Sequence, residues 1–103
     1  MARKFRVSGP ARSTLYAIGN YTEKGWGKKQ RRKYIQKFSY RFKYLADNPL
    51  LGIGCDHISP YMRSYPEGSH VIYYFVFDSY IEIVDILHKN MDVESHFDDL
   101  TKH

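Results

Sequence analysis

The sequence predicts an α+β fold in which a hairpin of two helices packs on one face of a small, mainly antiparallel sheet. Two observations predict it. Between residues 9 and 48 the apolar residues recur at the 3.6-residue period of helices, and beyond Pro49 they recur at the period of 2 that strands have. The expected order is β-α-α-β-β-β, followed by a short tail helix. With 103 residues the chain can bury one core, so we expect a single domain over residues 1–103.

A short strand and a first helix are expected in the N-terminal part. Lys4–Val7 is the strand candidate. Ser8 can serve as the N-cap of the helix, and Pro10 has its φ preset for the first turn. The apolar stripe of this helix consists of Ala11, Leu15, Ile18 and Thr22, and we expect the helix to end near Glu23.

A second helix is expected from Lys28 to Asn48. Gly25-Trp26-Gly27 interrupts the helical pattern before it, so the two helices should form a hairpin over residues 9–48 with Trp26 at its tip. The second stripe consists of Tyr34, Ile35, Phe38, Phe42 and Leu45, and Asn48-Pro49 ends the helix.

Three strands in a meander are expected over residues 61–88. We expect them at Tyr61–Tyr65, Ser69–Phe77 and Tyr80–His88, with a turn at Pro66-Glu67-Gly68. The second of these strands carries large apolar or aromatic residues on both faces, which predicts a central strand. Helices on one side of the sheet would leave part of its aromatic surface open for a partner, unless the tail folds over that face.

The faces of the last strand follow from simple alternation. Ile81, Ile83 and Leu87 should share one face, and Val84 and Ile86 should share the other. His88 continues the second set. An acidic tail follows at residues 89–103. Its residues 92–100 should form either a short helix or a loose segment.

The charge is distributed very unevenly. Residues 1–43 hold 13 of the 16 Lys and Arg and one acid, a net +12, whereas residues 44–103 carry a net −7. Nine of the bases lie between Lys24 and Lys43 with no acid among them. A run of one sign gains no support from ion pairs along the helix, which favours an anionic partner over a merely solvated face.

Composition excludes several other classes. Cys55 is the single cysteine, so an internal disulfide is impossible and a reducing cytoplasm is the expected location. We expect neither a signal peptide nor a membrane span. The five histidines lack the spacing of metal ligands, and we expect no metal and no cofactor.

An ordered set of segments carries a family resemblance. They are Trp26-Gly27, Leu45-Ala46-Asp47-Asn48-Pro49, Gly52, Asp56-His57-Ile58, Tyr61-Met62-Arg63, Gly68-Ser69-His70-Val71-Ile72-Tyr73-Tyr74 and Ile86-Leu87-His88-Lys89-Asn90-Met91-Asp92. Together they resemble the ParE toxins of type II toxin–antitoxin systems, within the RelE/ParE superfamily. The resemblance implies a RelE/ParE-like fold and a bacterial toxin that poisons DNA gyrase by protein–protein contact. It also implies a cognate acidic antitoxin, and contact with DNA only through the antitoxin or gyrase.

Two binding surfaces follow as expectations. An acidic amphipathic antitoxin should contact the basic hairpin and the aromatic strand face, at Arg31, Arg32, Lys33, Lys37, Arg41 and Tyr74. The gyrase contact should include the hairpin tip and the end of the last strand, at Trp26, Lys24, Lys28, His88, Lys89, Met91 and Asp92. Structural roles are the alternative, with Trp26 folded back over the helix ends, His88 capping the strand, Met91 sealing the core and Asp92 capping the tail helix.

A nuclease is the alternative function. A RelE-like ribosome-dependent mRNA interferase needs an acid, a base and a cation around the scissile phosphate, and Arg63, His70 and His88 could supply them. The acidic tail argues against RNA as a ligand. Direct binding of duplex DNA by the basic hairpin is a third possibility.

Overall fold

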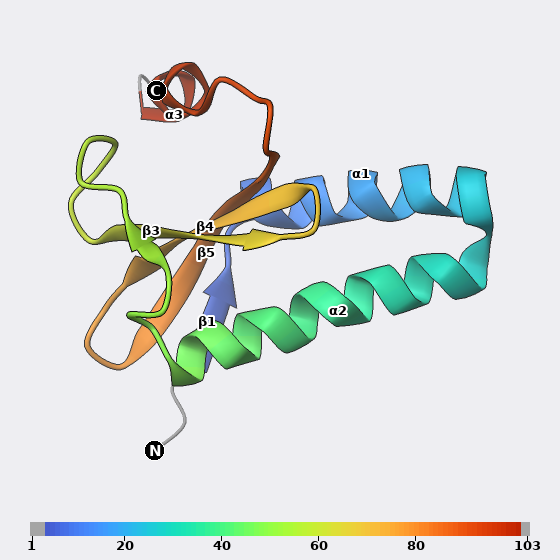
Figure 1. Ribbon diagram of the computed structural model, residues 1–103, viewed down its shortest axis with the longest axis horizontal. Coiled ribbons are helices and arrows are strands. Elements are labelled where there is room, and N and C mark those ends of the chain that lie inside the picture. Colours follow the sequence, from blue (N-terminus) through green and yellow to red (C-terminus); the bar gives the residue numbers. More distant parts are fainter. Residues whose placement is uncertain (1–3, 102–103) are drawn as a thin grey trace.

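The computed structural model describes residues 4–101, with side chains through residue 97, as five strands and three helices (Figure 1). The elements are β1 (Lys4–Val7), α1 (Gly9–Trp26), α2 (Lys28–Asp47), β2 (Ile53–Gly54), β3 (Met62–Glu67), β4 (His70–Val76), β5 (Tyr80–His88) and α3 (Val93–Thr101). The sheet order is β1-β5-β4-β3-β2; β1 runs parallel to β5, and the other neighbours are antiparallel. The predicted α+β fold and the central place of β4 are confirmed.

The helical hairpin covers one face of the sheet, and its far end projects beyond the sheet (Figure 1). Ser8 caps α1 as predicted, because its Oγ accepts from the Ala11 amide at 3.1 Å, and it also donates to the Val84 carbonyl at 2.6 Å. Helix α1 ends at Trp26 rather than near Glu23. Gly27, with φ of 90°, then begins the reversal into α2.

A bulge in β5 changes the faces of this strand. Tyr73 lies opposite Asp85 whereas Tyr74 lies opposite Ile83, so β5 contains one extra residue at this point. After it, Ile86 lies on the helix side with Ile81 and Ile83, and Leu87 lies on the far side. The predicted grouping of Leu87 with Ile81 and Ile83 is therefore wrong, and His88 also moves to the helix side of the sheet.

The far face of the sheet is closed by α3 and by the segment before β3. Phe97 is 5% exposed, and its ring centroid lies 5.3 Å from that of Tyr73. These two residues belong to a hydrophobic cluster on the far face, separate from the core beneath the helices. Its other buried residues are Met62, Leu87 and Cys55. The aromatic face that we expected to be open is covered by the tail, which is the alternative named above.

The loop before β2 is fastened by Tyr74, whose side chain is fully buried. Its hydroxyl donates to the Pro49 carbonyl at 2.8 Å and accepts from the Gly52 amide at 2.9 Å. A Cβ on Gly52 would lie 2.5 Å from that hydroxyl, so no larger residue fits there without a shift. The anchored loop pairs with β3 as the short strand β2, which the sequence analysis did not predict. Strand β3 continues through Glu67, where we expected a turn.

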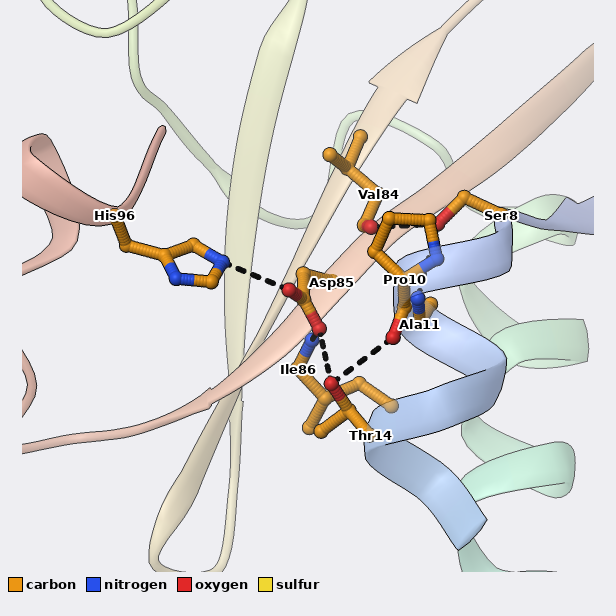
Figure 2. Close-up of polar contacts among 8 residues, drawn as sticks. All are labelled: Ser8, Pro10, Ala11, Thr14, Val84, Asp85, Ile86 and His96. Carbon is orange, nitrogen blue, oxygen red and sulfur yellow. Dashed lines mark hydrogen bonds and ion pairs between the residues drawn. The ribbon is translucent and has the colours of Figure 1, made fainter. Parts of the chain in front are cut away.

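A buried carboxylate joins three elements (Figure 2). Asp85 is 2% exposed, and its Oδ1 accepts from the Thr14 hydroxyl at 2.7 Å and from the Ile86 amide at 2.8 Å. Its Oδ2 lies 2.8 Å from His96 Nε2. Asp85 therefore links the bulge of β5 to the start of α1 and to α3.

Between residues 4 and 101 the structure contains no helix that is long and apolar enough to span a membrane.

Candidate partner-binding groove

A groove of about 630 Å³ lies between the helical hairpin and the adjacent ends of β4 and β5. Its lining consists of Ala17, Ile18, Tyr21, Thr22 and Trp26 from α1, Gln30 and Tyr34 from α2, and Ser69, His70 and His88 at the strand ends. The walls are mainly apolar and aromatic, with Thr22 and Gln30 as polar residues of the helices, and Ser69, His70 and His88 lie where the groove meets the sheet. We call this feature the hairpin groove.

Two histidines lie side by side at its floor. His70 and His88 are opposite each other in β4 and β5, with ring centroids 5.6 Å apart. Burial lowers the pKa of His70 below its ordinary value of 6.5, and the neighbouring His88 lowers this pKa further. The Tyr34 hydroxyl lies 3.5 Å from His70 Nδ1. The two rings meet only because the β5 bulge turns His88 to this side.

The His70 environment predicts a pH effect on stability. Because the pKa of His70 is lower in the folded chain, the unfolded chain binds the proton first as the pH falls below about 6.5. The free energy of unfolding should therefore decrease as the pH falls toward the pKa that His70 has in the folded chain. The variant His70→Gln should lose less of this free energy than the wild type. Urea denaturation at about pH 7 and about pH 5 measures the difference. Equal losses in the two proteins would show that the low pKa of His70 is not linked to folding.

Trp26 stands at the outer end of the groove. It is the last residue of α1, and 70% of its surface is exposed, so it does not fold back over the helix ends. The hairpin groove thus brings together Trp26 and His88 of the predicted gyrase contact. Lys24 and Lys28 are also exposed near the tip, and Lys28 lines a different pocket together with Arg12 and Arg31.

The rest of the predicted gyrase contact lies in the connection from β5 to α3. Lys89, Met91 and Asp92 are exposed there. Met91 is 46% exposed, so it does not seal the core as the structural alternative supposed. Asp92 does cap α3, because its Oδ1 accepts from the Ser95 amide at 3.3 Å. Asp98, Asp99 and the end of the acidic tail lie beyond the described side chains.

The five cations expected to bind an antitoxin divide into two groups. Arg41 is held by Glu67, since its Nε donates to Oε1 at 3.0 Å, and this hydrogen bond raises the pKa of Arg41. Arg31 donates to Asn20 at 2.8 Å and lies 3.4 Å from a Glu23 carboxylate oxygen. Arg32, Lys33 and Lys37 are exposed, and within residues 4–97 none of the three forms an ion pair.

Tyr74 does not belong to such a surface in this structure. Its side chain has no exposed area and its hydroxyl is committed to the loop before β2. Alternation within β4 puts Tyr74 on the same side of the sheet as Ile72, in the core beneath the helices and opposite Ile83. The remaining candidates for an antitoxin surface are thus the hairpin cations.

Arg63 is separated from the histidine pair. It lies opposite Tyr74, four residues along β4 from His70, or roughly 13 Å at the usual rise of a strand. Its Nε donates to the Gly52 carbonyl at 2.9 Å, which fixes it to the loop. The three residues of the nuclease alternative are therefore not assembled. In the described part of the chain no three His, Cys, Asp or Glu side chains cluster as metal ligands would.

Two solved structures share this fold. One is a chain of the chromosomal ParDE toxin–antitoxin system of P. aeruginosa, with a TM-score of 0.71 and 19% identity, covering 84% of this chain and 96% of that one. Another belongs to the RelBE2 toxin–antitoxin complex of Mycobacterium tuberculosis, with a TM-score of 0.61 and 17% identity, covering 86% and 100%. The fold is the RelE/ParE toxin fold.

Sequence comparison gives the family. The model for the ParE toxin of the type II toxin–antitoxin system parDE matches residues 5–93. Toxin ParE1 of Mycobacterium tuberculosis is 33% identical over 95 residues, covering 91% of this chain and 97% of the relative. Toxin ParE1 of Caulobacter vibrioides is 29% identical over 94 residues, with the same coverage. The chain belongs to the ParE toxin family.

Proposed function

We propose that this ParE-family toxin poisons DNA gyrase by protein–protein contact through the hairpin groove. The observation that supports the proposal most is that Trp26 at the hairpin tip and His88 at the end of β5 line the same groove. An exposed tryptophan beside an apolar groove is a typical anchor in protein interfaces. The RelE-like nuclease has less support, because Arg63 lies far from the two histidines.

A cognate acidic antitoxin is the second partner, and it would hold the toxin in a hetero-oligomer in the bacterial cytoplasm. Two observations support this part. The solved relatives come from toxin–antitoxin systems. The exposed cations of α2 would also attract an acidic segment to the rim of the groove. An antitoxin bound there would cover the surface that gyrase needs, and contact with DNA would be indirect.

Neutralising the exposed cations tests the antitoxin surface. The variant Arg32→Gln/Lys33→Gln/Lys37→Gln should associate with the antitoxin about tenfold more slowly at low salt, because steering by opposite charge is weakened. Its melting temperature should change little, since these side chains are exposed. Stopped-flow association at several salt concentrations measures the effect. An unchanged rate with an unchanged salt dependence would remove these residues from the interface.

The target is tested with antitoxin-free protein in two parallel reactions. One contains gyrase, ATP and supercoiled plasmid, and the other contains translating ribosomes and messenger RNA. A gyrase poison yields linear plasmid after detergent and protease treatment, and leaves the message intact. Cut message with intact plasmid would instead make the chain an interferase. Plain duplex DNA in a filter-binding assay is the control for direct DNA binding, which should be weak.

A further inference from the structure

We propose that His70 and His88 form a carboxylate-binding subsite at the floor of the hairpin groove, and that it receives an acidic side chain from an apolar segment of the antitoxin. The inference rests on the proposed function, because that function supplies the partner. It adds the chemistry by which the groove recognises the partner and the pH dependence of that recognition.

The polar floor contrasts with the walls above it. Most wall residues of α1 and α2 are apolar or aromatic, Thr22 and Gln30 excepted, and the imidazoles lie where the groove reaches the sheet. A site of this size with a few convergent polar groups is typical of a specific ligand or anchor residue. The apolar walls would hold the anchor segment, and the floor would select its polar group.

No carboxylate of the described chain competes for the two imidazoles. Glu67 lies opposite His70 in β3, but Arg41 of α2 neutralises it with a hydrogen bond of 3.0 Å. The other polar groups on the groove side are neutral: the Gln30 amide and the Tyr34 hydroxyl from α2, Ser69 beside His70, and the hydroxyls of Tyr21 and Thr22 from α1. Lys89, which follows His88, is the nearest cation along the chain. An incoming carboxylate would therefore meet hydrogen-bond donors and no competing carboxylate.

The hydrogen bonds of the rings define the donor. His88 Nδ1 accepts from the Asn90 amide at 3.3 Å, so the neutral ring carries its proton on Nε2. That N–H is available to a ligand in the groove. His70 is held neutral by burial, and a carboxylate beside it would favour the imidazolium and raise its pKa again. Docking should then take up a proton, so the affinity should rise as the pH falls from 7.5 to about 6.

Charge complementarity favours an acidic protein segment as the occupant. Gln30 and Tyr34 of α2 line the groove. Lys33 follows Gln30 by three residues and Lys37 follows Tyr34 by three, so both lysines lie on the groove side of that helix. Both are exposed. An amphipathic segment with apolar anchors and acidic flanks would match the walls, the floor and the rim together.

The test uses Trp26, the single tryptophan of the chain, as a reporter at the mouth of the groove. The indole N–H signal of the ¹⁵N-labelled protein is followed by NMR during titration with 3-phenylpropionate or its neutral analogue 3-phenylpropionamide. We expect the acid to bind about tenfold more tightly than the amide near pH 6, because charge-assisted hydrogen bonds are the stronger ones. The preference should shrink at pH 7.5. Unlabelled antitoxin should displace the acid.

Matched variants show which residues cause the preference for the acid over the amide. His70→Gln/His88→Gln should bind acid and amide equally, whereas His57→Gln, which removes an exposed histidine outside the groove, should keep the preference. If the double variant unfolds, His88→Gln alone serves the test, because His88 is exposed and its loss should leave the fold intact.

Three outcomes would overturn the inference. They are equal binding of acid and amide by the wild type, a preference that survives in His88→Gln and the double variant, and antitoxin that binds without displacing the acid. Displacement by gyrase and not by the antitoxin would also assign the groove to another occupant. A plasmid that stays intact with gyrase contradicts the proposed target but leaves these binding results unaffected.

Discussion

Replacing Asp85 by alanine should lower the free energy of unfolding by about 3 kcal/mol, since removing one partner of a buried polar network leaves the others unpaired. The carboxylate is 2% exposed and serves α1, β5 and α3 at once through Thr14, Ile86 and His96 (Figure 2). Its loss should loosen the bulge as well as the attachment of α3. Urea denaturation followed by circular dichroism measures the change.

The control and a double-mutant cycle separate this network from a general charge effect. Asp56→Ala removes an exposed carboxylate and should cost less than about 0.5 kcal/mol. Thr14→Val alone should cost about 1 kcal/mol, and its effect should largely disappear in the Asp85→Ala background. A loss below about 1 kcal/mol for Asp85→Ala would contradict the linking role given to this residue.

Trp26→Ala should reduce gyrase poisoning by tenfold or more, with a melting temperature close to that of the wild type. The expected loss is that of an interface hot spot, for which truncation typically costs about 2 kcal/mol or more. The fold should tolerate the change because 70% of the side chain is exposed. The readout is the amount of linear plasmid released at a fixed toxin concentration.

Tyr40→Ala provides the matched control. Tyr40 is an aromatic residue of the same hairpin that is also 70% exposed, but it does not line the groove. This variant should keep both activity and melting temperature. Full activity of Trp26→Ala, or equal losses in the two variants, would contradict a specific anchor at the hairpin tip.

Local signals in the sequence predicted most of the elements. The spacing of apolar residues placed both helices, Ser8 and Pro10 marked the start of α1, and alternation between two turns gave the bounds of β5. These features depend on neighbours within a few residues. A tail helix was one of the two alternatives for the acidic tail, and Asp92 caps it as the structural alternative proposed.

The features that were missed depend on contacts between distant residues. The β5 bulge is a shift of one residue, stabilised by Asp85 through Thr14 of α1 and His96 of α3, and alternation within β5 cannot reveal it. Strand β2 likewise depends on the buried hydroxyl of Tyr74, some 20 residues further along the chain.

The sequence predicted individual residues of the candidate site but not the groove that they share. Trp26 and His88 were each singled out from local sequence, but the groove that contains both exists only because the bulge turns His88 toward the helices. The same bulge places His88 beside His70, a pairing that the unknown register had left open. Asp85 gave no signal in the sequence, because an acidic residue inside an apolar strand does not reveal its partners.

Photocrosslinking from the hairpin groove tests the central claim most directly. A benzophenone side chain is introduced at position 26, or at position 40 as the control, and the protein is irradiated with gyrase alone, with antitoxin alone and with both. The proposed function predicts crosslinks from position 26 to gyrase that antitoxin replaces with crosslinks to itself, and few crosslinks from position 40. Equal crosslinking from both positions, or gyrase crosslinks that persist with bound antitoxin, would contradict a single groove shared by the two partners.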